Sequence, residues 1–193
     1  MQSENRRRIL RNVAVIGGIV LVIIVIFLII RAIFSSGSAA PQTQLSNPLL
    51  NTSTDRGVMM TIRGAIVANE NARSYEIAVT PTTRSITQYS GYDGTVLQKE
   101  VLDNSPASYE QFVYALDKGG MTISRSVDNA DTRGVCATGR IFTFSLQRDT
   151  TIASSLWTSS CSKEKGTLNT NAGYLQNLFD AQIPDAGKYI NGI

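Results

Sequence analysis

The stretch that decides the architecture of this 193-residue chain is VAVIGGIVLVIIVIFLII, from Val13 to Ile30, in which every residue is apolar or glycine. Arg31 interrupts it, and the apolar character resumes through Phe34. Because a helix rises about 1.5 Å per residue, residues 13–34 would reach about 33 Å, enough to cross the roughly 30 Å hydrocarbon core of a bilayer. A lone backbone segment in lipid satisfies its polar groups only as a helix. The sequence therefore predicts one N-terminal transmembrane helix over residues 13–34.

The charges on the two sides of this apolar segment are unequal. The basic side chains that precede it are Arg6, Arg7, Arg8 and Arg11. Only Arg31 lies close behind it, where its long side chain can extend to the lipid headgroups. Since basic flanks stay on the cytoplasmic side, we expect a single-pass plasma-membrane protein. Residues 1–12 would form a cytoplasmic arginine-rich tail, and the chain after the helix would lie outside the cytoplasm with the bilayer as its first partner.

Two alternatives to a permanent anchor stay open. The apolar core of a secretory signal peptide is about 7–15 residues long, which is shorter than this segment. The small residues around Ala39 nevertheless offer a site for a signal peptidase, and cleavage there would release the rest of the chain. A buried helix of a soluble protein is the other alternative, but it would not need arginines on one side alone.

A linker and an uneven charge distribution follow the anchor. Residues 35–57 are small, polar and punctuated by proline, which is typical of a flexible tether. Residues 1–57 contain six arginines and two acidic residues, whereas the other 136 residues contain 12 basic and 13 acidic ones. The net charge of +3 therefore belongs to the membrane flank. Nucleic-acid binding has no support, because the remainder of the chain carries no excess of positive charge.

Residues 58–193 are predicted to form one extracytoplasmic domain of ordinary size. Alternating apolar residues predict strands over Ser74–Val79 and Arg140–Gln147. The glycine-bounded turn at Gly91–Gly94 predicts a hairpin between two further strands. The other segments expected to be strands are Val58–Val67, Met121–Val127 and Thr151–Ser159.

Two helices complete the predicted domain. Ser105 can cap the first helix, and Pro106 suits its first position. Its apolar stripe at helical spacing is Tyr109, Phe112, Val113 and Leu116. The second helix is expected from Asn171 to Gln182, with its stripe formed by Leu175, Leu178 and Phe179. The predicted fold class is α+β: one transmembrane helix followed by a small, mostly antiparallel sheet domain with two helices.

Cys136 and Cys161 are the two cysteines of the chain, and they lie on either side of the last predicted hairpin. If that hairpin turns at Arg148-Asp149, the two cysteines lie directly opposite each other, within reach of a disulfide. An extracytoplasmic location permits oxidation, so we expect a structural disulfide. The alternatives are two buried apolar side chains, a redox-active pair, which lacks the CxxC motif, and metal ligands, which no histidine would assist.

The sequence offers little catalytic chemistry. The absence of histidine excludes Ser-His and Cys-His pairs and the usual zinc and haem ligands. Ser160 with Lys163, and Ser162 with Lys165, fit the S-x-x-K spacing of Ser-Lys enzymes. The segment is polar, however, and we expect both lysines to be solvated. No catalytic residue, cofactor site or metal site is predicted.

Two functions of different classes follow. The leading hypothesis is a non-enzymatic binding or assembly module of the cell envelope, with an envelope protein as a further partner. The alternative is a membrane-tethered hydrolase that uses carboxylates or a Ser-Lys pair. Specific ligand and oligomeric state do not follow from the sequence.

Four segments carry a resemblance to a known family: ENARSYEIAVTPTTR (70–84), YEQFVYALDKGG (109–120), DTRGVCATGRIF (131–142) and LWTSSCSKEKGTL (156–168). In these segments the chain resembles a family of small single-pass envelope proteins from candidate-phylum (Saccharibacteria-like) bacteria. The resemblance covers most of residues 58–193. It implies a bacterial plasma-membrane setting and agrees with a pair of bonded cysteines, but it implies no activity and no binding residues.

Overall fold

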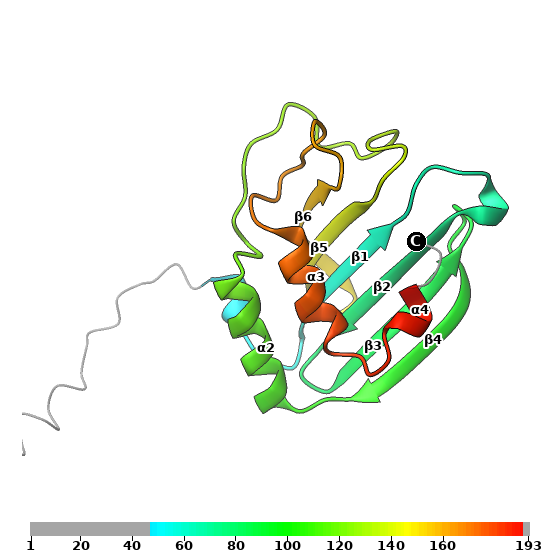
Figure 1. The fold of residues 1–193 in the computed structure, drawn as a ribbon. Helices are drawn as coiled ribbons and strands as arrows, with labels where there is room; N and C mark the ends of the chain where they lie inside the picture. Colours follow the sequence, from blue (N-terminus) through cyan, green and yellow to red (C-terminus); the bar gives the residue numbers. More distant parts are fainter. Residues whose placement is uncertain (1–46, 191–193) are drawn as a thin grey trace, which may run out of the picture. The chain divides into compact units, whose positions relative to one another are not determined.

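Six strands and a few short helices make up residues 47–190, the part of the chain that the computed structural model describes (Figure 1). The strands are β1 (Arg56–Arg63), β2 (Arg73–Val79), β3 (Thr83–Ser90), β4 (Thr95–Asp103), β5 (Ile141–Arg148) and β6 (Thr151–Ser159). The helices are η1 (Pro48–Leu50), η2 (Asn69–Asn71), α2 (Pro106–Lys118), α3 (Ala172–Asp180) and α4 (Gly187–Ile190). The predicted α+β class is confirmed for this part of the chain.

The predicted membrane anchor falls outside the residues described. Within residues 47–190, no helix is both long enough and apolar enough to cross a membrane. The predicted transmembrane helix over 13–34 and the tail over 1–12 lie before this range. The anchor residues that therefore stay predictions are Arg6, Arg7, Arg8, Arg11, Val13, Ile30 and Arg31.

The six strands form one antiparallel sheet in the order β4-β3-β2-β1-β5-β6. β1, the first strand in sequence, lies at the centre, where it pairs with β2 on one side and β5 on the other. β4 and β6 are the two outer strands. The predicted hairpins β3–β4 and β5–β6 are both present, and the sheet is antiparallel as predicted.

The helices α2 and α3 pack against one face of the sheet and form the main core with it (Figure 1). Alternation along the strands places one set of side chains under these helices, for example Tyr75, Ile77 and Val79 of β2, all fully buried. The ring of Phe179 on α3 meets the Phe112 ring of α2 edge to face, with 5.1 Å between ring centroids. The other face of the sheet carries none of the described helices, and we call it the open face.

The helix signals in the sequence are confirmed. The hydroxyl of Ser105 accepts a hydrogen bond from the backbone amide of Ser108, and Pro106 occupies the first turn of α2. The amide oxygen of Asn171 accepts from the backbone amide of Tyr174 and caps α3. All four residues of the predicted α2 stripe are buried, so this helix faces the core as its spacing predicted.

The folded domain begins before Val58, the boundary that the sequence predicted. The side chain of Leu49 in η1 is only 1% exposed and belongs to the main core. The side-chain amide of Asn47 donates to the carboxylate of Asp117 on α2 at 2.5 Å. The described portion of the predicted linker over 35–57 is therefore part of the domain from residue 47.

The predicted register of the last hairpin is wrong by three residues over most of its length. Phe142 pairs with Thr158 rather than with Ser155, because the chain turns at Asp149-Thr150 and the register shifts between Leu146 and Gln147. Asp149 adopts a positive φ of 51°, a conformation that aspartate tolerates better than most residues. Because the predicted pairing is off by an odd number of residues, side chains predicted to lie opposite each other on one face lie on opposite faces of the sheet.

Two smaller expectations also differ from the structure. Residues 121–127 do not form a strand, and their pairing is limited to one bridge between Ser124 and Leu168. Met121 at its start belongs to the main core, but Ile123 is 53% exposed, so the apolar residues of this segment do not anchor it in the sheet as a strand. The short helix α4 was not predicted; it follows Pro184, where the sequence expectation ended.

Candidate functional site

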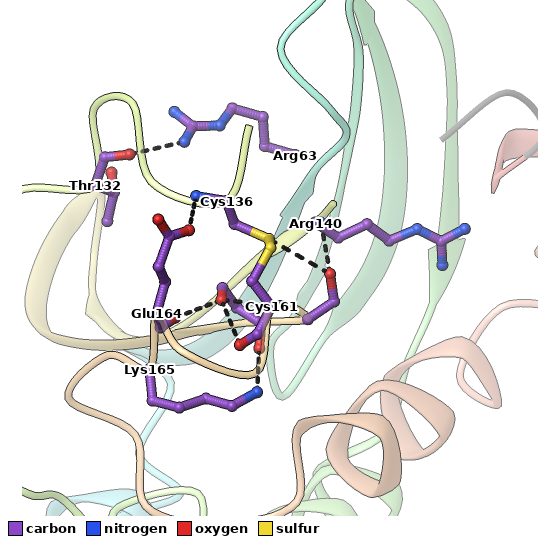
Figure 2. The surroundings of a disulfide bond; sticks show 9 residues. Arg63, Thr132, Cys136, Arg140, Cys161, Glu164 and Lys165 are labelled. Carbon is purple, nitrogen blue, oxygen red and sulfur yellow. Dashed lines mark hydrogen bonds between the residues drawn. A yellow bond between two sulfur atoms is a disulfide. The ribbon is translucent and has the colours of Figure 1, made fainter. Parts of the chain in front are cut away.

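A disulfide joins Cys136 and Cys161, as the sequence predicted, with 5.6 Å between their Cα atoms (Figure 2). The geometric reasoning behind that prediction is corrected, because the cysteines are not opposed residues of a ladder. Cys136 precedes β5 and Cys161 follows β6, so the bond ties together the two loops that leave this end of the hairpin.

Polar contacts surround the disulfide (Figure 2); one of them joins the same two loops, and the others hold the loop after β6 in shape. The backbone amide of Cys136 donates to the carboxylate of Glu164. The hydroxyl of Ser159 donates to the backbone carbonyl of Glu164, and the ammonium of Lys165 donates to the carbonyl of Ser159 at 2.9 Å. We call the group formed by Cys136, Ser159, Cys161, Glu164 and Lys165 the clamp.

Of the serines and lysines that the sequence singled out, Lys165 belongs to the clamp and Ser160 lies beside it, and both make structural contacts. Ser160 accepts a hydrogen bond from the backbone amide of Arg140 at 2.9 Å. Lys165 bonds to a backbone carbonyl and not to a hydroxyl. Within residues 47–190, no lysine ammonium is hydrogen-bonded to a serine hydroxyl, which is the contact that a Ser-Lys nucleophile needs.

Glu164 is also the third member of a group that could bind a metal ion. Its carboxylate and the sulfur atoms of Cys136 and Cys161 lie within 4.8 Å of one another. A cysteine binds a metal as its thiolate. While the two sulfurs are bonded to each other, neither can supply that ligand, so the disulfide and a metal at this place are mutually exclusive.

Trp157 packs beside the clamp on the open face. It forms a small apolar cluster with Cys136 and Ile141, separate from the main core. Gly166 lies directly on the indole, and a Cβ atom at that position would collide with the ring and with the Trp157 carbonyl. Glycine at position 166 therefore lets the loop after the clamp close over the tryptophan.

A cavity of about 390 Å³ lies on the other side of the clamp, between the end of β6 and the first turn of α3. Lys165 of the clamp lines it, together with Arg125, Thr158 and the first residues of α3. These residues come from three separate parts of the chain, so sequence spacing gave no signal for the cavity.

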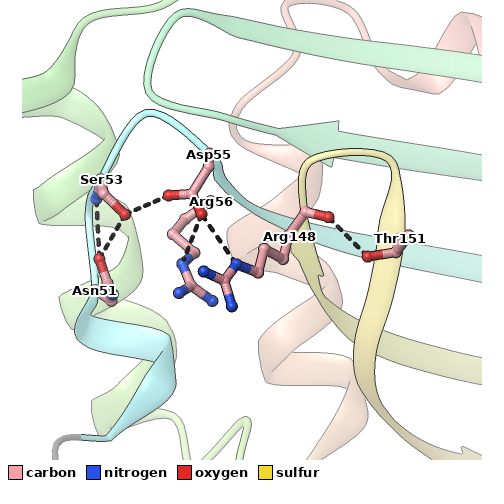
Figure 3. Close-up of polar contacts among 6 residues, drawn as sticks. All are labelled: Asn51, Ser53, Asp55, Arg56, Arg148 and Thr151. Carbon is pink, nitrogen blue, oxygen red and sulfur yellow. Dashed lines mark hydrogen bonds and ion pairs between the residues drawn. The ribbon is translucent and has the colours of Figure 1, made fainter.

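A second polar cluster fixes the N-terminal end of the domain to the β5–β6 turn (Figure 3). The carboxylate of Asp55 accepts a hydrogen bond from the Ser53 hydroxyl at 2.5 Å and lies 3.5 Å from Arg56 and 3.3 Å from Arg148. The Ser53 hydrogen bond, with help from the two arginines, holds the pKa of Asp55 below its ordinary value. The backbone carbonyl of Asp55 accepts from the Asp149 amide, so this cluster tethers a turn rather than forming a cleft.

One row of side chains crosses the whole open face. In order from β4 to β6 it consists of Lys99, Thr87, Glu76, Thr61, Thr143 and Trp157. Glu76 lies on β2, among neighbouring strands on both sides, and burial raises its pKa although Lys99 partly offsets the effect. A carboxylate at the middle of a sheet face is therefore disfavoured in its charged form.

Replacing this carboxylate gives a pH-dependent prediction. We expect Glu76→Gln to raise the melting temperature by a few degrees at pH 7 and to leave it unchanged near pH 4. A raised native pKa means that protonation favours the folded state, so the parent loses stability as the pH rises from about 4.3 through the native pKa. Glutamine removes this dependence. Thermal unfolding followed by circular dichroism at several pH values measures the difference.

The matched control is Glu110→Gln, which changes an exposed carboxylate on α2. We expect no pH-dependent change of the melting temperature for this variant. Equal behaviour of the two variants, or stabilisation by Glu76→Gln at pH 4 as well, would contradict the burial of charge at Glu76.

Exposed apolar side chains gather along β4 and at the adjoining corner of the sheet. They are Ile66, Val67, Tyr92, Val96, Leu97 and Val101, each more than 40% exposed. The hydroxyl of Tyr92 bonds to both the amide and the carbonyl of Val67, which joins the corner to the turn before β4. We call this surface the β4 edge.

Comparison of the chain with protein-family models, with curated proteins and with solved structures gives no match in any of the three. The resemblance to envelope proteins stays a prediction.

Proposed function

We propose that this protein is a membrane-anchored module of the cell envelope that binds an extended segment of a partner protein along the β4 edge. The observation that carries the proposal is an outer strand that pairs with none of residues 47–190 on its outer side and that is apolar on its surface. The predicted anchor over 13–34, with its one-sided arginines, supports an extracytoplasmic location for the domain.

The backbone of β4 supplies the first part of the recognition. In the described sheet, β4 pairs only with β3, so alternate amide and carbonyl groups along its outer side point away from the sheet. An added strand from another protein satisfies these groups, a mode known as β-strand addition. Strand β4 has nine residues, long enough for such a partner to pair over several positions.

The side chains of β4 supply the specificity. Lys99 and Val101 pair with Thr87 and Ser85 and so point to the same face, where Val101 is 56% exposed. Leu97, 47% exposed, lies beside them at the irregularity in the β3–β4 register. Soluble surfaces rarely gather apolar side chains without a partner to cover them. The complementary segment would place an acidic residue opposite Lys99 and apolar residues on either side of it.

Charge also argues against a second copy of this chain as the occupant. The antiparallel pairing of two β4 strands that sets Leu97 opposite Val101 also sets Lys99 opposite Lys99. Like charges directly opposite each other destabilise a strand pair, and a lysine on an outer strand is a common guard against self-association. A different protein therefore fits the β4 edge better.

Site-specific photocrosslinking of the full-length chain in its native membranes tests the proposal. A photoactivatable residue at Leu97 or Val101 is expected to yield adducts with one partner protein, whereas the same residue at Tyr114 or Tyr174, equally exposed on the helical side, is not. We expect Lys99→Glu to lower the adduct yield at Val101 by about tenfold, because it reverses the complementary charge. Lys163→Glu, a charge reversal away from β4, is the control.

Mass spectrometry of the adduct then identifies the segment that was bound. A segment with an acidic residue between apolar ones supports the proposal. Adducts between two copies of this chain would show that β4 is a dimer interface instead. Equal yields from β4 and from the helical side, or yields that Lys99→Glu leaves unchanged, would also overturn the proposal.

A further inference from the structure

The cavity beside the clamp has a basic lining. Arg125 and Lys165 both line it, and none of the described residues that line it is acidic. The Arg125 guanidinium donates to the carbonyls of Gly166 at 2.8 Å and Leu168 at 2.6 Å, which fixes its position and leaves further N–H groups unused. Lys165 uses one of its three donors on the Ser159 carbonyl. Two positioned cations with spare donors therefore face the same space.

The start of α3 adds backbone donors to this lining. Ala172 and Gly173, the first two residues of the helix, line the cavity. Amide groups in a first helical turn have no acceptor within the helix, and Asn171 caps the amide of Tyr174, further along. The positive end of the helix dipole adds to the attraction for an anion.

Thr158 adds a hydroxyl to the same lining. Its side chain is only 5% exposed and lines the cavity. Its pairing with Phe142 places it on the helix side of the sheet. Its hydroxyl oxygen is not among the fully buried atoms of residues 47–190 that lack a hydrogen bond, so it is open to the cavity. A hydroxyl can both donate and accept, so we expect it to bond to an occupant of the cavity.

From these observations we infer that the cavity between β6 and α3 binds an oxyanion of the phosphate type, either as free phosphate or as the phosphate of a lipid headgroup. Phosphate matches the lining because its several oxygens can accept bonds at once from the guanidinium, the ammonium, the helix amides and the threonine hydroxyl. The clamp positions Lys165, and the Arg125 bonds to the next loop position the guanidinium. The site is distinct from the β4 edge, since β4 and β6 are opposite edges of the sheet.

Calorimetric titration of the full-length chain in neutral detergent with inorganic phosphate tests the inference, with sodium chloride at matched ionic strength as the blank. We expect saturable binding of phosphate. We expect Thr158→Val, which keeps the side-chain shape and removes only the hydroxyl, to weaken it about tenfold, with a melting temperature equal to or above that of the parent. Lys165→Gln is expected to weaken binding by a similar factor. Lys163→Gln removes an exposed charge outside the cavity lining and should leave affinity unchanged.

A second arm separates the two sources of phosphate. The chain is placed in nanodiscs of phosphatidylcholine with or without phosphatidic acid, and the inorganic phosphate titration is repeated. Competition by phosphatidic acid identifies a lipid headgroup as the ligand, and unchanged phosphate binding identifies a soluble one. The absence of binding in detergent and of any competition in nanodiscs overturns the inference. So does equal weakening by Lys163→Gln and Lys165→Gln, which would reflect surface charge alone. Neither result bears on the β4 edge.

Discussion

Replacing Phe179 by alanine is expected to lower the free energy of unfolding by about 3–5 kcal/mol, the usual cost of truncating a buried phenylalanine. Phe179 is fully buried. Its ring contacts Phe112 of α2 edge to face and lies 6.0 Å from the Phe144 ring of β5. One side chain therefore joins both long helices to the sheet, and the cavity left by alanine would open at the centre of the core.

This loss is a large fraction of the roughly 5–15 kcal/mol by which an ordinary domain is stable. Urea unfolding of the full-length chain, followed by the emission of Trp157, measures it. Tyr174→Ala changes an aromatic residue on the same helix that is 49% exposed, and we expect a change of less than about 0.5 kcal/mol. Similar losses for both variants would show that α3 does not pack as described.

The second large effect is expected from the disulfide. Replacing Cys136 and Cys161 together by serine should lower the free energy of unfolding by about 3 kcal/mol, because the bond restricts the unfolded chain over a separation of 25 residues. Both cysteines are replaced so that no free thiol is left to form other bonds.

Reduction of the parent provides the matched comparison. We expect dithiothreitol to destabilise the parent by a similar amount and to leave the double serine variant unaffected. A parent that is insensitive to the reductant under denaturing conditions, or a double variant as stable as the parent, would contradict the role of the bond in linking the two loops.

Elements with strong local signals were predictable from the sequence. The alternation of Tyr75, Ile77 and Val79 places β2, and the cap at Ser105 begins α2 at the observed residue. These signals lie within one element, where chain geometry alone relates spacing to facing side. The register of β5 and β6 was not predictable, since it depends on the positive φ of Asp149 and on an irregularity that composition does not reveal.

The disulfide illustrates how a correct pairing can follow from incorrect geometry. The sequence correctly placed Cys136 and Cys161 at the same end of one hairpin, which is all that proximity required. Their true position beyond the strands depends on loops whose shape is set by Glu164 and by the close approach of Gly139, where a Cβ atom would meet both sulfurs.

The candidate sites depend on tertiary structure that the sequence did not reveal. The cavity brings Arg125 to Lys165 and to the start of α3, three segments without a common motif. The β4 edge exists because β1 pairs with β5, which leaves β4 as an outer strand. Strand order of this kind depends on long-range pairing, and no pattern within β4 itself distinguishes an outer strand from an inner one.

The central position of β1 also governs when this domain can fold during synthesis. Arg56, at the start of β1, pairs with Arg148, so one side of the first strand waits for a segment made much later. Contacts between residues so far apart in the sequence are slow to form, because a long loop must close before any stabilisation is gained. A nascent chain that has not reached Phe179 exposes both an unpaired strand and an incomplete core. Folding is therefore expected only after nearly the whole polypeptide has emerged, and until then the unfinished chain is prone to aggregation.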